Sequence, residues 1–400
     1  MSHVMNTYAR QPVAFVRGEG VWLWDEQGRK YLDALAGIAV NTLGYAHPRL
    51  TKALTERIKS GVLHTSNLWR IPDQEAAADR IAEITGLDEV FFCNSGLEAN
   101  EAAIKIARKY GHERGIAEPA IIVMEKAFHG RSLATLSATG SRKVQAGFEP
   151  LVSGFVRVPL NDLAAVRTVA ANNRNIAAVM IEPIQGEGGI NVSRLDYLRE
   201  LKQICDEHQW LFICDEVQCG LGRTGKWFVY QHAGFLPDVV PLAKGLGSGV
   251  PVGACVVGGR ALGVFKPGNH GSTFGGNPLA MTAVVATLDT IKQEGLMENA
   301  ARVGKVISDS LRSELGAHEG VAEIRGMGLM LGLELRRGCG ELVKQALEAG
   351  LVINVTVDNV VRMLPPLVMS EAEGRQVAER LVPLVREFLG RAAQPKAAAH

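Results

Sequence analysis

Short runs of apolar, mostly β-forming residues alternate with amphipathic stretches between roughly residues 75 and 260. The apolar runs are typical of buried strands, and the stretches between them, such as 100–110 and 193–208, are typical of helices. The alternation predicts βαβ units and a mostly parallel sheet. The expected strands are Val90–Phe92, Ala120–Met124, Phe155–Val158, Ala177–Ile181, Leu211–Cys214, Val239–Leu242 and Ala254–Val257.

The last expected strand departs from this pattern, because only a glycine-rich loop separates Leu242 from Ala254. A crossover between parallel strands needs a dozen or more residues and usually contains a helix. We therefore expect an α/β fold with a seven-stranded, mostly parallel sheet in which the final strand runs antiparallel.

Smaller units are expected before and after this sheet in the sequence. A hairpin is predicted from 21–24 and 29–32 around the turn Asp25–Gly28, and a helix follows from Pro48 to Ser60. After a helical region at about 278–315, we expect strands at 328–335, 351–354 and 360–364, and a last helix from the capping box Ser370–Glu373 to near Gly390. The expected parts are an N-terminal segment (1–60) that packs with the C-terminal domain, a large domain (61–277), and a connecting helix with a small α+β domain (278–400).

Composition excludes several classes of protein. Of the 400 residues, 47% are hydrophobic and 21% are charged, which is ordinary globular usage. The 43 Lys and Arg nearly balance the 42 Asp and Glu, so no broad field would hold nucleic acid or a membrane. There is no apolar stretch of signal-peptide or membrane-spanning length, and the six cysteines form no CxxC pair, so neither a disulfide scaffold nor a metal site is predicted. We expect a cytoplasmic enzyme.

Polar residues follow five of the expected strands at their carboxyl ends, where open α/β sheets bind ligands. They are Asn94–Glu98, Phe128–Arg131, Glu182–Glu187, Asp215–Gln218 and Lys244. We expect these residues to line one crevice.

Lys244 is the most informative of them, because it is the only charged residue between Val239 and Gly259. A loop lysine usually extends its ammonium group into solvent, and that interpretation stays open. Small apolar neighbours at the end of a strand instead lower the pKa of an amine and leave it able to form a Schiff base.

The other rim residues each have an ordinary and a chemical interpretation. Asp215 either caps a helix or forms a salt bridge, or it holds a proton on a heteroaromatic ring nitrogen opposite Lys244. Ser95 and Glu98 have the spacing of a capping box, and the same helix start would suit a phosphate. Phe128 is either a core aromatic or a surface on which a flat cofactor stacks.

A glycine-rich stretch, Gly220–Gly225, matches GxGxxG and would support a nucleotide-dependent enzyme. No clean helix opens after it, and no acidic residue ends a second strand about 20 residues later. With Lys226 it nearly forms a P-loop, but Trp227 occupies the Ser/Thr position. We interpret the stretch as a loop.

Six segments, taken in order, resemble the class III aminotransferases of the fold type I pyridoxal phosphate enzymes, and the resemblance covers about residues 14–389. The segments are Asn94–Glu101, Phe128–Arg131, Glu182–Gly188, Asp215–Gln218, Ala243–Gly247 and Gly271–Pro278. The resemblance implies pyridoxal 5'-phosphate as cofactor, a small-molecule amino donor with 2-oxoglutarate or glutamate as substrates, and a homodimer with shared active sites.

The resemblance also implies roles for single residues. Lys244 would form the covalent link to the cofactor and move the substrate proton, and Asp215 would pair with the ring nitrogen, supported by Glu182. Val217 and Phe128 would cover the two ring faces. The other cofactor-binding residues would be Ser95, Gly96 and Leu97 at the phosphate, Thr273 at the phosphate of the neighbouring subunit, Gln218 at the ring hydroxyl, and Glu216 in the same motif as Asp215.

On the substrate side, the resemblance implies that Arg131 binds a carboxylate, with Ser272 nearby. Arg362 matches a second carboxylate-binding arginine, and Glu187 matches the acid that pairs with it when a monocarboxylate amine is bound. Bidentate guanidinium–carboxylate pairing would place the distal amine at the cofactor. Without the family context, either arginine is equally well explained by a surface ion pair.

Two segments, Gly37–Gly44 and His64–Leu68, resemble the branch of the class that acts on N2-acetylornithine. Ornithine δ-aminotransferases carry a tyrosine where this chain has Gly37, which argues against free ornithine as donor. The implied reaction moves the distal amino group of N2-acetyl-L-ornithine to 2-oxoglutarate. Succinyldiaminopimelate, succinylornithine and 4-aminobutyrate transaminases remain alternatives.

Overall fold

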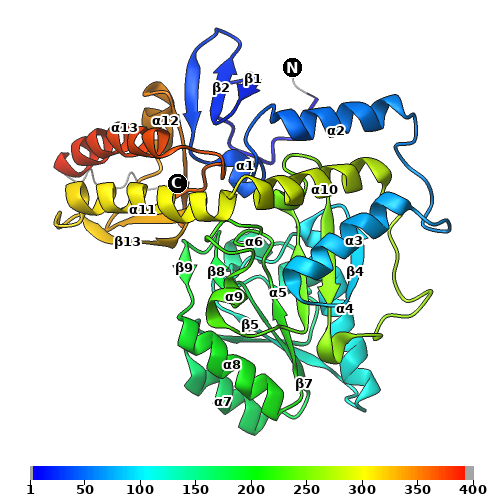
Figure 1. Ribbon diagram of the computed structural model, residues 1–400. Helices are drawn as coiled ribbons and strands as arrows, with labels where there is room; N and C mark the ends of the chain where they lie inside the picture. The colour runs from blue at the N-terminus through cyan, green and yellow to red at the C-terminus, as the bar shows by residue number, and fades with distance from the viewer. Residues whose placement is uncertain (1–2, 392–400) are drawn as a thin grey trace.

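The computed structural model describes residues 3–391, and its centre is a seven-stranded sheet with the order β4-β12-β11-β10-β7-β5-β6 (Figure 1). The pairings show that β12 runs antiparallel to both β11 and β4, as the short glycine-rich connection predicted. The other pairings within the sheet are parallel. The strands are β4 (Glu89–Cys93), β5 (Ala120–Met124), β6 (Phe155–Val158), β7 (Ile176–Ile181), β10 (Leu211–Cys214), β11 (Val239–Leu242) and β12 (Gly253–Val257).

Helices cover both faces of this sheet, which explains why its inner strands β5, β7, β10, β11 and β12 carry no charged residue. In β5, Ile121 and Val123 pack into a cluster with α4 (Gly96–Glu113), whereas Ile122 and Met124 pack into the cluster on the other face. That second cluster includes residues of α3 (Pro72–Thr85), α7 (Leu163–Asn172), α8 (Leu195–Glu207) and α9 (Val229–Ala233). Shorter helices, α5 (Leu133–Ala138) and α6 (Arg142–Gln145), follow β5 in the chain.

The N-terminal strands pair with a strand from near the C-terminus. The predicted hairpin is present as β2 (Trp22–Asp25) and β3 (Lys30–Asp33), and β1 (Phe15–Glu19), which the sequence pattern did not predict, pairs with β2. On the other side of β3 lies β15 (Leu351–Val352), in parallel. The segment continues through α1 (Ala36–Ala39) and α2 (Pro48–Lys59), the latter as expected.

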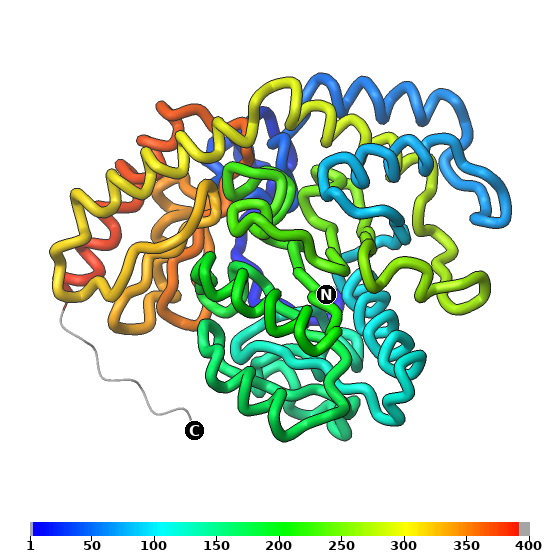
Figure 2. The backbone as a smooth tube through the Cα atoms, turned by 60° about the horizontal axis from the view of Figure 1, so that its bottom comes forward, coloured from blue at the N-terminus to red at the C-terminus, as the bar shows by residue number. Residues whose placement is uncertain are grey.

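The helical region expected at 278–315 is two helices, α10 (Pro278–Gln293) and α11 (Leu296–Leu315), which follow each other across the molecule (Figures 1 and 2). The chain changes direction at Gly295, which has a φ of 61° that glycine adopts without a steric penalty. Helix α11 packs against the last helix, α13 (Glu371–Gly390), which begins at the predicted Ser370 capping box.

The C-terminal sheet has the order β13-β14-β17-β16, with each neighbouring pair antiparallel. Its strands are β13 (Val321–Met327), β14 (Met330–Leu335), β16 (Asn354–Thr356) and β17 (Val360–Met363), and α12 (Leu342–Glu348) lies between β14 and β15 in the chain. A two-stranded hairpin, β8 (Ile184–Gln185) and β9 (Asn191–Val192), completes the strands. The domain boundaries at residues 60 and 277 stay a prediction.

Within residues 3–391, no helix is long and apolar enough to cross a membrane. All six cysteines are buried and free.

Candidate active site

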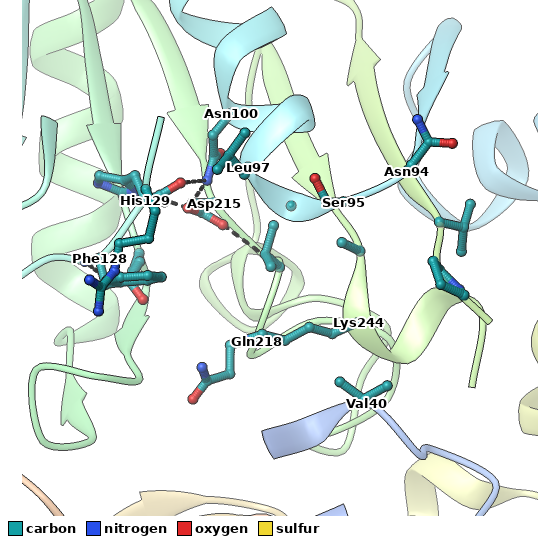
Figure 3. Close-up of a pocket in the computed structure, with 18 of the residues that line it drawn as sticks. Val40, Asn94, Ser95, Leu97, Asn100, Phe128, His129, Asp215, Gln218 and Lys244 are labelled. Atoms are coloured by element: carbon teal, nitrogen blue, oxygen red, sulfur yellow. Dashed lines mark hydrogen bonds and ion pairs between the residues drawn. The ribbon is translucent and has the colours of Figure 1, made fainter. Parts of the chain in front are cut away.

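A cavity of about 360 Å³ opens at the carboxyl ends of the central strands (Figure 3). It is lined by residues from the segments that follow β4, β5, β7, β10 and β11, so the five rim segments meet as the strand pattern predicted. The expected site residues in its wall are Ser95, Gly96, Leu97, Phe128, Arg131, Glu182, Asp215, Val217, Gln218 and Lys244.

Asp215 follows β10 and is held by three donors (Figure 3). Its Oδ2 accepts from Asn100 Nδ2 at 2.8 Å and lies 2.7 Å from His129 Nδ1, and its Oδ1 accepts from the amide of Val217 at 3.1 Å. Burial alone would lower the pKa of His129, but the hydrogen bond and charge of Asp215 raise it above its ordinary value. The three contacts therefore hold the Asp215 side chain in a fixed orientation at the cavity wall.

Asn100 and His129 line the cavity and contact Asp215, and sequence reasoning did not single them out. Both lie inside segments that were singled out, Asn94–Glu101 and Phe128–Arg131, so the signal was present. In the sheet, β10 lies between β4 and β5, the strands that precede the two segments. This strand order brings both side chains to Asp215.

Glu182 follows β7 and positions backbone on two sides of the cavity. Its side chain accepts from the amide of Phe128 at 2.7 Å and from the amide of Gly186 at 3.2 Å. The residue is 4% exposed, and burial raises the pKa of its carboxyl group to about 7. Glu182 thus supports Phe128 and the start of the β8–β9 turn, rather than contacting Asp215 by a hydrogen bond of its own.

Lys244 follows β11 and begins a 3₁₀ turn, Lys244–Leu246, with a φ of 44°. A non-glycine residue in this left-handed region is uncommon and is held there by its surroundings. Burial of the Lys244 amine, together with the positive charge of Arg362, lowers its pKa to about 8. Lys244 therefore has far more neutral amine near pH 8 than an ordinary lysine.

We expect Lys244→Met to raise the free energy of unfolding of the cofactor-free protein by about 1–3 kcal/mol at pH 7, because the folded state no longer holds a desolvated ammonium group. The gain should shrink as pH rises from about 8 toward 10.5, since the folded wild type loses this proton before the unfolded chain does. Urea unfolding at several pH values measures both. Lys226→Met, at an exposed lysine, is the control and should have the same free energy of unfolding as the wild type. A difference between Lys244→Met and the wild type that does not change with pH would contradict the expectation.

The start of α4 forms another part of the cavity wall. Ser95 is the N-cap, and its hydroxyl accepts from the amide of Glu98 at 3.2 Å, as the capping-box spacing predicted. A Cβ at Gly96 would lie 2.7 Å from Val217 Cγ1, so only glycine lets the helix begin this close to Val217. The first amides of a helix have no partner within it and attract anions.

Arg362 and Glu187, 175 residues apart, form an ion pair beside the cavity. Arg362 is fully buried and donates Nη1 to Glu187 Oε1 at 2.6 Å and to Gln218 Oε1 at 3.2 Å. Its Nε donates to Asn354 Oδ1 at 3.1 Å, and its buried Nη2 has no partner among the described residues. Burial would raise the pKa of Glu187, but the charge of Arg362 lowers it. A buried guanidinium with a free donor is suited to a carboxylate.

Besides Arg362 and Glu187, three more of the expected site residues lie outside the cavity wall. Glu216 points into the core, where its carboxyl group accepts from the amides of Val229 and Tyr230 at 2.6 and 3.2 Å, and burial raises its pKa to about 7. Ser272 Oγ accepts from Asn94 Nδ2 at 3.2 Å, which joins its loop to the cavity rim. Thr273 is exposed.

The glycine-rich stretch Gly220–Gly225 is a loop, as interpreted from the sequence, and the next helix, α9, has only five residues. Within the loop, Arg223 is buried and donates Nη1 to the carbonyls of Leu329 and Pro365 at 2.8 and 2.9 Å. The stretch therefore joins the central sheet to the C-terminal part of the chain.

Comparison with known proteins bears on these assignments. Residues 4–385 match the family model described as aminotransferase class-III. An acetylornithine aminotransferase from Nitrosomonas europaea is 59% identical over 389 residues, which cover 97% of this chain and 99% of that protein.

Solved structures of aminotransferases are similar to this chain over almost its whole length. An acetylornithine aminotransferase from Elizabethkingia anophelis has a TM-score of 0.86 and 35% identity, covering 96% of this chain and 97% of the other. An ornithine aminotransferase from Toxoplasma gondii, with partial occupancy of PLP at its active site, has a TM-score of 0.92 and 34% identity, covering 97% and 94%. With its α/β fold of seven mostly parallel strands, this chain belongs to the class III aminotransferases, which are pyridoxal phosphate-dependent transaminases.

Proposed function

We propose that this aminotransferase moves the distal amino group between N2-acetyl-L-ornithine and 2-oxoglutarate in arginine biosynthesis, giving N-acetylglutamate semialdehyde and glutamate. The observation that carries the proposal is one cavity that holds Lys244, Asp215 and Arg131, with the Arg362–Glu187 pair beside it. The acetylornithine relatives favour this substrate over succinyldiaminopimelate, succinylornithine and 4-aminobutyrate.

The residues of the cavity fit pyridoxal 5'-phosphate. The absence of a Cβ at Gly96 lets the start of α4 approach Val217 closely, and Phe128 lies in the wall of the same cavity. Ser95, Gly96 and Leu97 would hold the phosphate at the helix N-terminus, Val217 and Phe128 would cover the ring, and Gln218 would bind its hydroxyl. Glu216, whose side chain faces the core, would help to hold the backbone of its neighbours Asp215 and Val217 at the cofactor.

When bound, pyridoxal phosphate supplies an electron sink for the electron pair released as a substrate C–H bond breaks. Asp215, fixed by Asn100 and His129, would keep a proton on the ring nitrogen, which that role requires. Lys244 Nζ would take the proton from the substrate carbon that bears the amine and would deliver it to C4′ of the cofactor. A pKa of about 8 suits an amine for both directions of this transfer.

The substrate carboxylates would be bound by the two arginines. Arg131, whose guanidinium carbon lies 5.6 Å from the Phe128 ring centroid, would take one carboxylate beside the cofactor, with Ser272 nearby. Arg362 would take the second carboxylate of glutamate or 2-oxoglutarate. Glu187 would neutralise Arg362 when acetylornithine, which has no second carboxylate, occupies the site.

We also propose a cytoplasmic homodimer in which Thr273 reaches the phosphate site of the neighbouring subunit. Thr273 lies outside its own cavity wall, and large apolar side chains near it in sequence or in the fold are exposed: Leu68, Trp69 and Phe274. Exposed apolar surface of this kind is typical of a subunit interface. Six buried free thiols are consistent with a reducing compartment.

Initial rates with a panel of amines test the substrate. With 2-oxoglutarate as acceptor, kcat/KM for acetylornithine should exceed that for ornithine and 4-aminobutyrate by at least about tenfold. Ornithine carries a second charged amine, and 4-aminobutyrate has a shorter chain that lacks the acylated α-amino group. Succinylornithine measures the acyl preference. A clear preference for ornithine or 4-aminobutyrate would contradict the proposal.

A further inference from the structure

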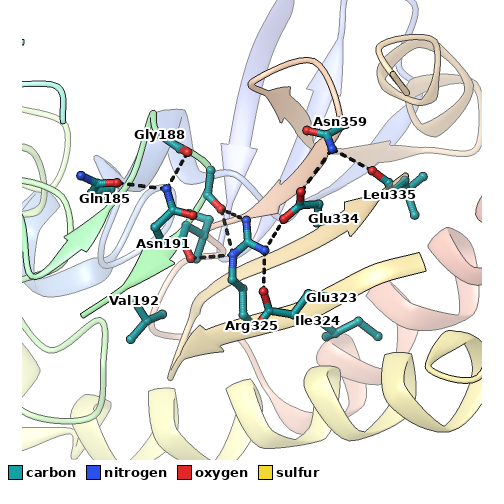
Figure 4. Close-up of polar contacts among 12 residues, drawn as sticks. Gln185, Gly188, Asn191, Val192, Glu323, Ile324, Arg325, Glu334, Leu335 and Asn359 are labelled. Carbon is teal, nitrogen blue, oxygen red and sulfur yellow. Dashed lines mark hydrogen bonds and ion pairs between the residues drawn. The ribbon is translucent and has the colours of Figure 1, made fainter. Parts of the chain in front are cut away.

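A guanidinium group outside the cavity joins the C-terminal sheet to the β8–β9 hairpin (Figure 4). Arg325 of β13 donates Nη2 to the carbonyl of Gly189 at 2.6 Å, and Nε to the carbonyls of Gly189 and Ile190 at 3.2 and 3.0 Å. Its Nη1 donates to Glu323 at 2.8 Å and also to Glu334. One edge of the guanidinium thus binds hairpin backbone, and the other binds carboxylates of its own sheet.

Arg325 also shares a row of the sheet with the buried arginine of the site. Arg325 lies directly across from Gly332 on β14, and Gly332 lies directly across from Arg362 on β17. Residues paired in this way project from the same face of a sheet. The gap left by the glycine is filled by Ile190, because a Cβ on Gly332 would lie 3.0 Å from Ile190 Cβ. The hairpin therefore rests on the sheet between the two arginines.

The same hairpin carries Glu187, so it meets the row at two points. Glu187 Oε1 accepts from Arg362 Nη1 at 2.6 Å, and the Glu187 carbonyl accepts from Thr356 Oγ1 at 2.5 Å. Arg325 binds the turn two and three residues further along. The placement of the Glu187 carboxylate consequently depends on the conformation of the turn that Arg325 binds.

That conformation is one the turn would not keep by itself. Gly189 has a φ of 109°, and Ile190, a β-branched residue, has a φ of 56°. A non-glycine residue in this region is strained and persists only where its surroundings enforce it. The carbonyls of these two residues are the ones that Arg325 binds, so Arg325 is a principal source of that enforcement.

We propose that Arg325 is a positioning residue that keeps Glu187 on Arg362 and so sets the preference of the site between monocarboxylate amines and dicarboxylate substrates. The inference rests on the proposed function, in which Arg362 takes a second carboxylate and Glu187 covers it otherwise. Without Arg325, the turn relaxes and Glu187 neutralises Arg362 less often. Monocarboxylate amines then meet an uncompensated buried charge, whereas glutamate and 2-oxoglutarate, which displace Glu187 themselves, are little affected.

Arg325→Lys tests this, because lysine keeps the charge beside Glu334 but lacks the planar fork that binds two carbonyls. In single-turnover half-reactions of the holoenzyme, kcat/KM for acetylornithine should fall about tenfold, in line with the cost of misplacing a binding group. The value for glutamate should change less than about threefold, and calorimetric binding of glutarate, an unreactive dicarboxylate, should be unchanged or tighter. Hydrogen exchange of amides 184–192 should become faster.

Two further variants separate positioning from general damage. Glu323→Gln removes the exposed partner of Arg325 and should leave both half-reactions within about twofold, as expected for an exposed ion pair. In a Glu187→Gln background, Arg325→Lys should cause no further loss for acetylornithine, because the group that it positions is already gone.

Equal losses for acetylornithine and glutamate, unchanged exchange of the hairpin amides, or additive effects in the double variant would each overturn the inference. If Arg325→Lys does not fold, Glu334→Gln, which removes the charge that orients Arg325, must give the same selective loss in smaller measure, and its absence counts equally against the inference. If the wild type ignores acetylornithine but accepts 4-aminobutyrate, the proposed substrate is wrong, and the selective loss is then expected with 4-aminobutyrate.

Discussion

Lys244→Ala is expected to lower kcat for transamination by at least about 10³-fold, because among residues 3–391 it removes the one lysine amine in the cavity wall that could move the substrate proton. The absorbance band of covalently bound pyridoxal phosphate should disappear in the same variant. Steady-state rates and absorbance spectra of the purified protein measure the two effects.

The matched control is Lys226→Ala, at an exposed lysine in the nearby loop, which should keep both the rate and the band. Thermal unfolding shows whether either variant has lost its fold. A Lys244→Ala protein that turns over at the parent rate would refute the assignment of Lys244.

Asp215→Asn is expected to lower kcat by about 10²–10³-fold while the protein stays folded. The substitution keeps the shape of the side chain but removes the charge that would hold a proton on the ring nitrogen. It also places an amide where Asn100 and His129 donate hydrogen bonds, so the local network is disturbed.

Single-turnover rates and cofactor retention separate the two contributions. Asp196→Asn, at a carboxylate on the first turn of α8 outside the cavity, should leave kcat unchanged. A rate for Asp215→Asn within a factor of three of wild type, with cofactor bound, would be incompatible with the proposed role.

The inner strands of the central sheet could be predicted because each is buried on both faces. Ala120–Met124 is fully buried, so every position is apolar and the run stands out in the sequence. By contrast, β13 is exposed at Ala322 and Glu323 and only partly buried from Ile324 to Met327, and β1 is largely exposed. Both strands are defined by their hydrogen-bonded partners rather than by an apolar run, which is why the pattern did not indicate them.

The site, too, has residues whose positions could be predicted from the sequence and residues whose positions could not. The position of Lys244 and Asp215 after neighbouring strands could be read from the order of elements, because parallel strands end at one edge. Glu216 follows Asp215, but its side chain takes the opposite direction and caps α9. The Arg362–Glu187 pair joins residues 175 positions apart, so no spacing predicts it, and only the family resemblance pointed to it.

The contacts that hold the site together were least visible in the sequence. His129 on Asp215 and Arg325 on the β8–β9 turn are single polar side chains in segments remote from their partners. A hydrogen bond between such residues depends on three-dimensional placement to within a few tenths of an ångström, which hydrophobic periodicity does not encode.

The central claim, that the Lys244 amine holds the cofactor, is tested most directly by chemical mapping of the resting holoenzyme. Sodium borohydride makes a carbonyl–amine link permanent, and peptide mass spectrometry then locates the added pyridoxyl group. We predict a single labelled peptide, with the modification at Lys244. A label on another lysine, or cofactor that dialyses away unmodified after reduction, would contradict the account.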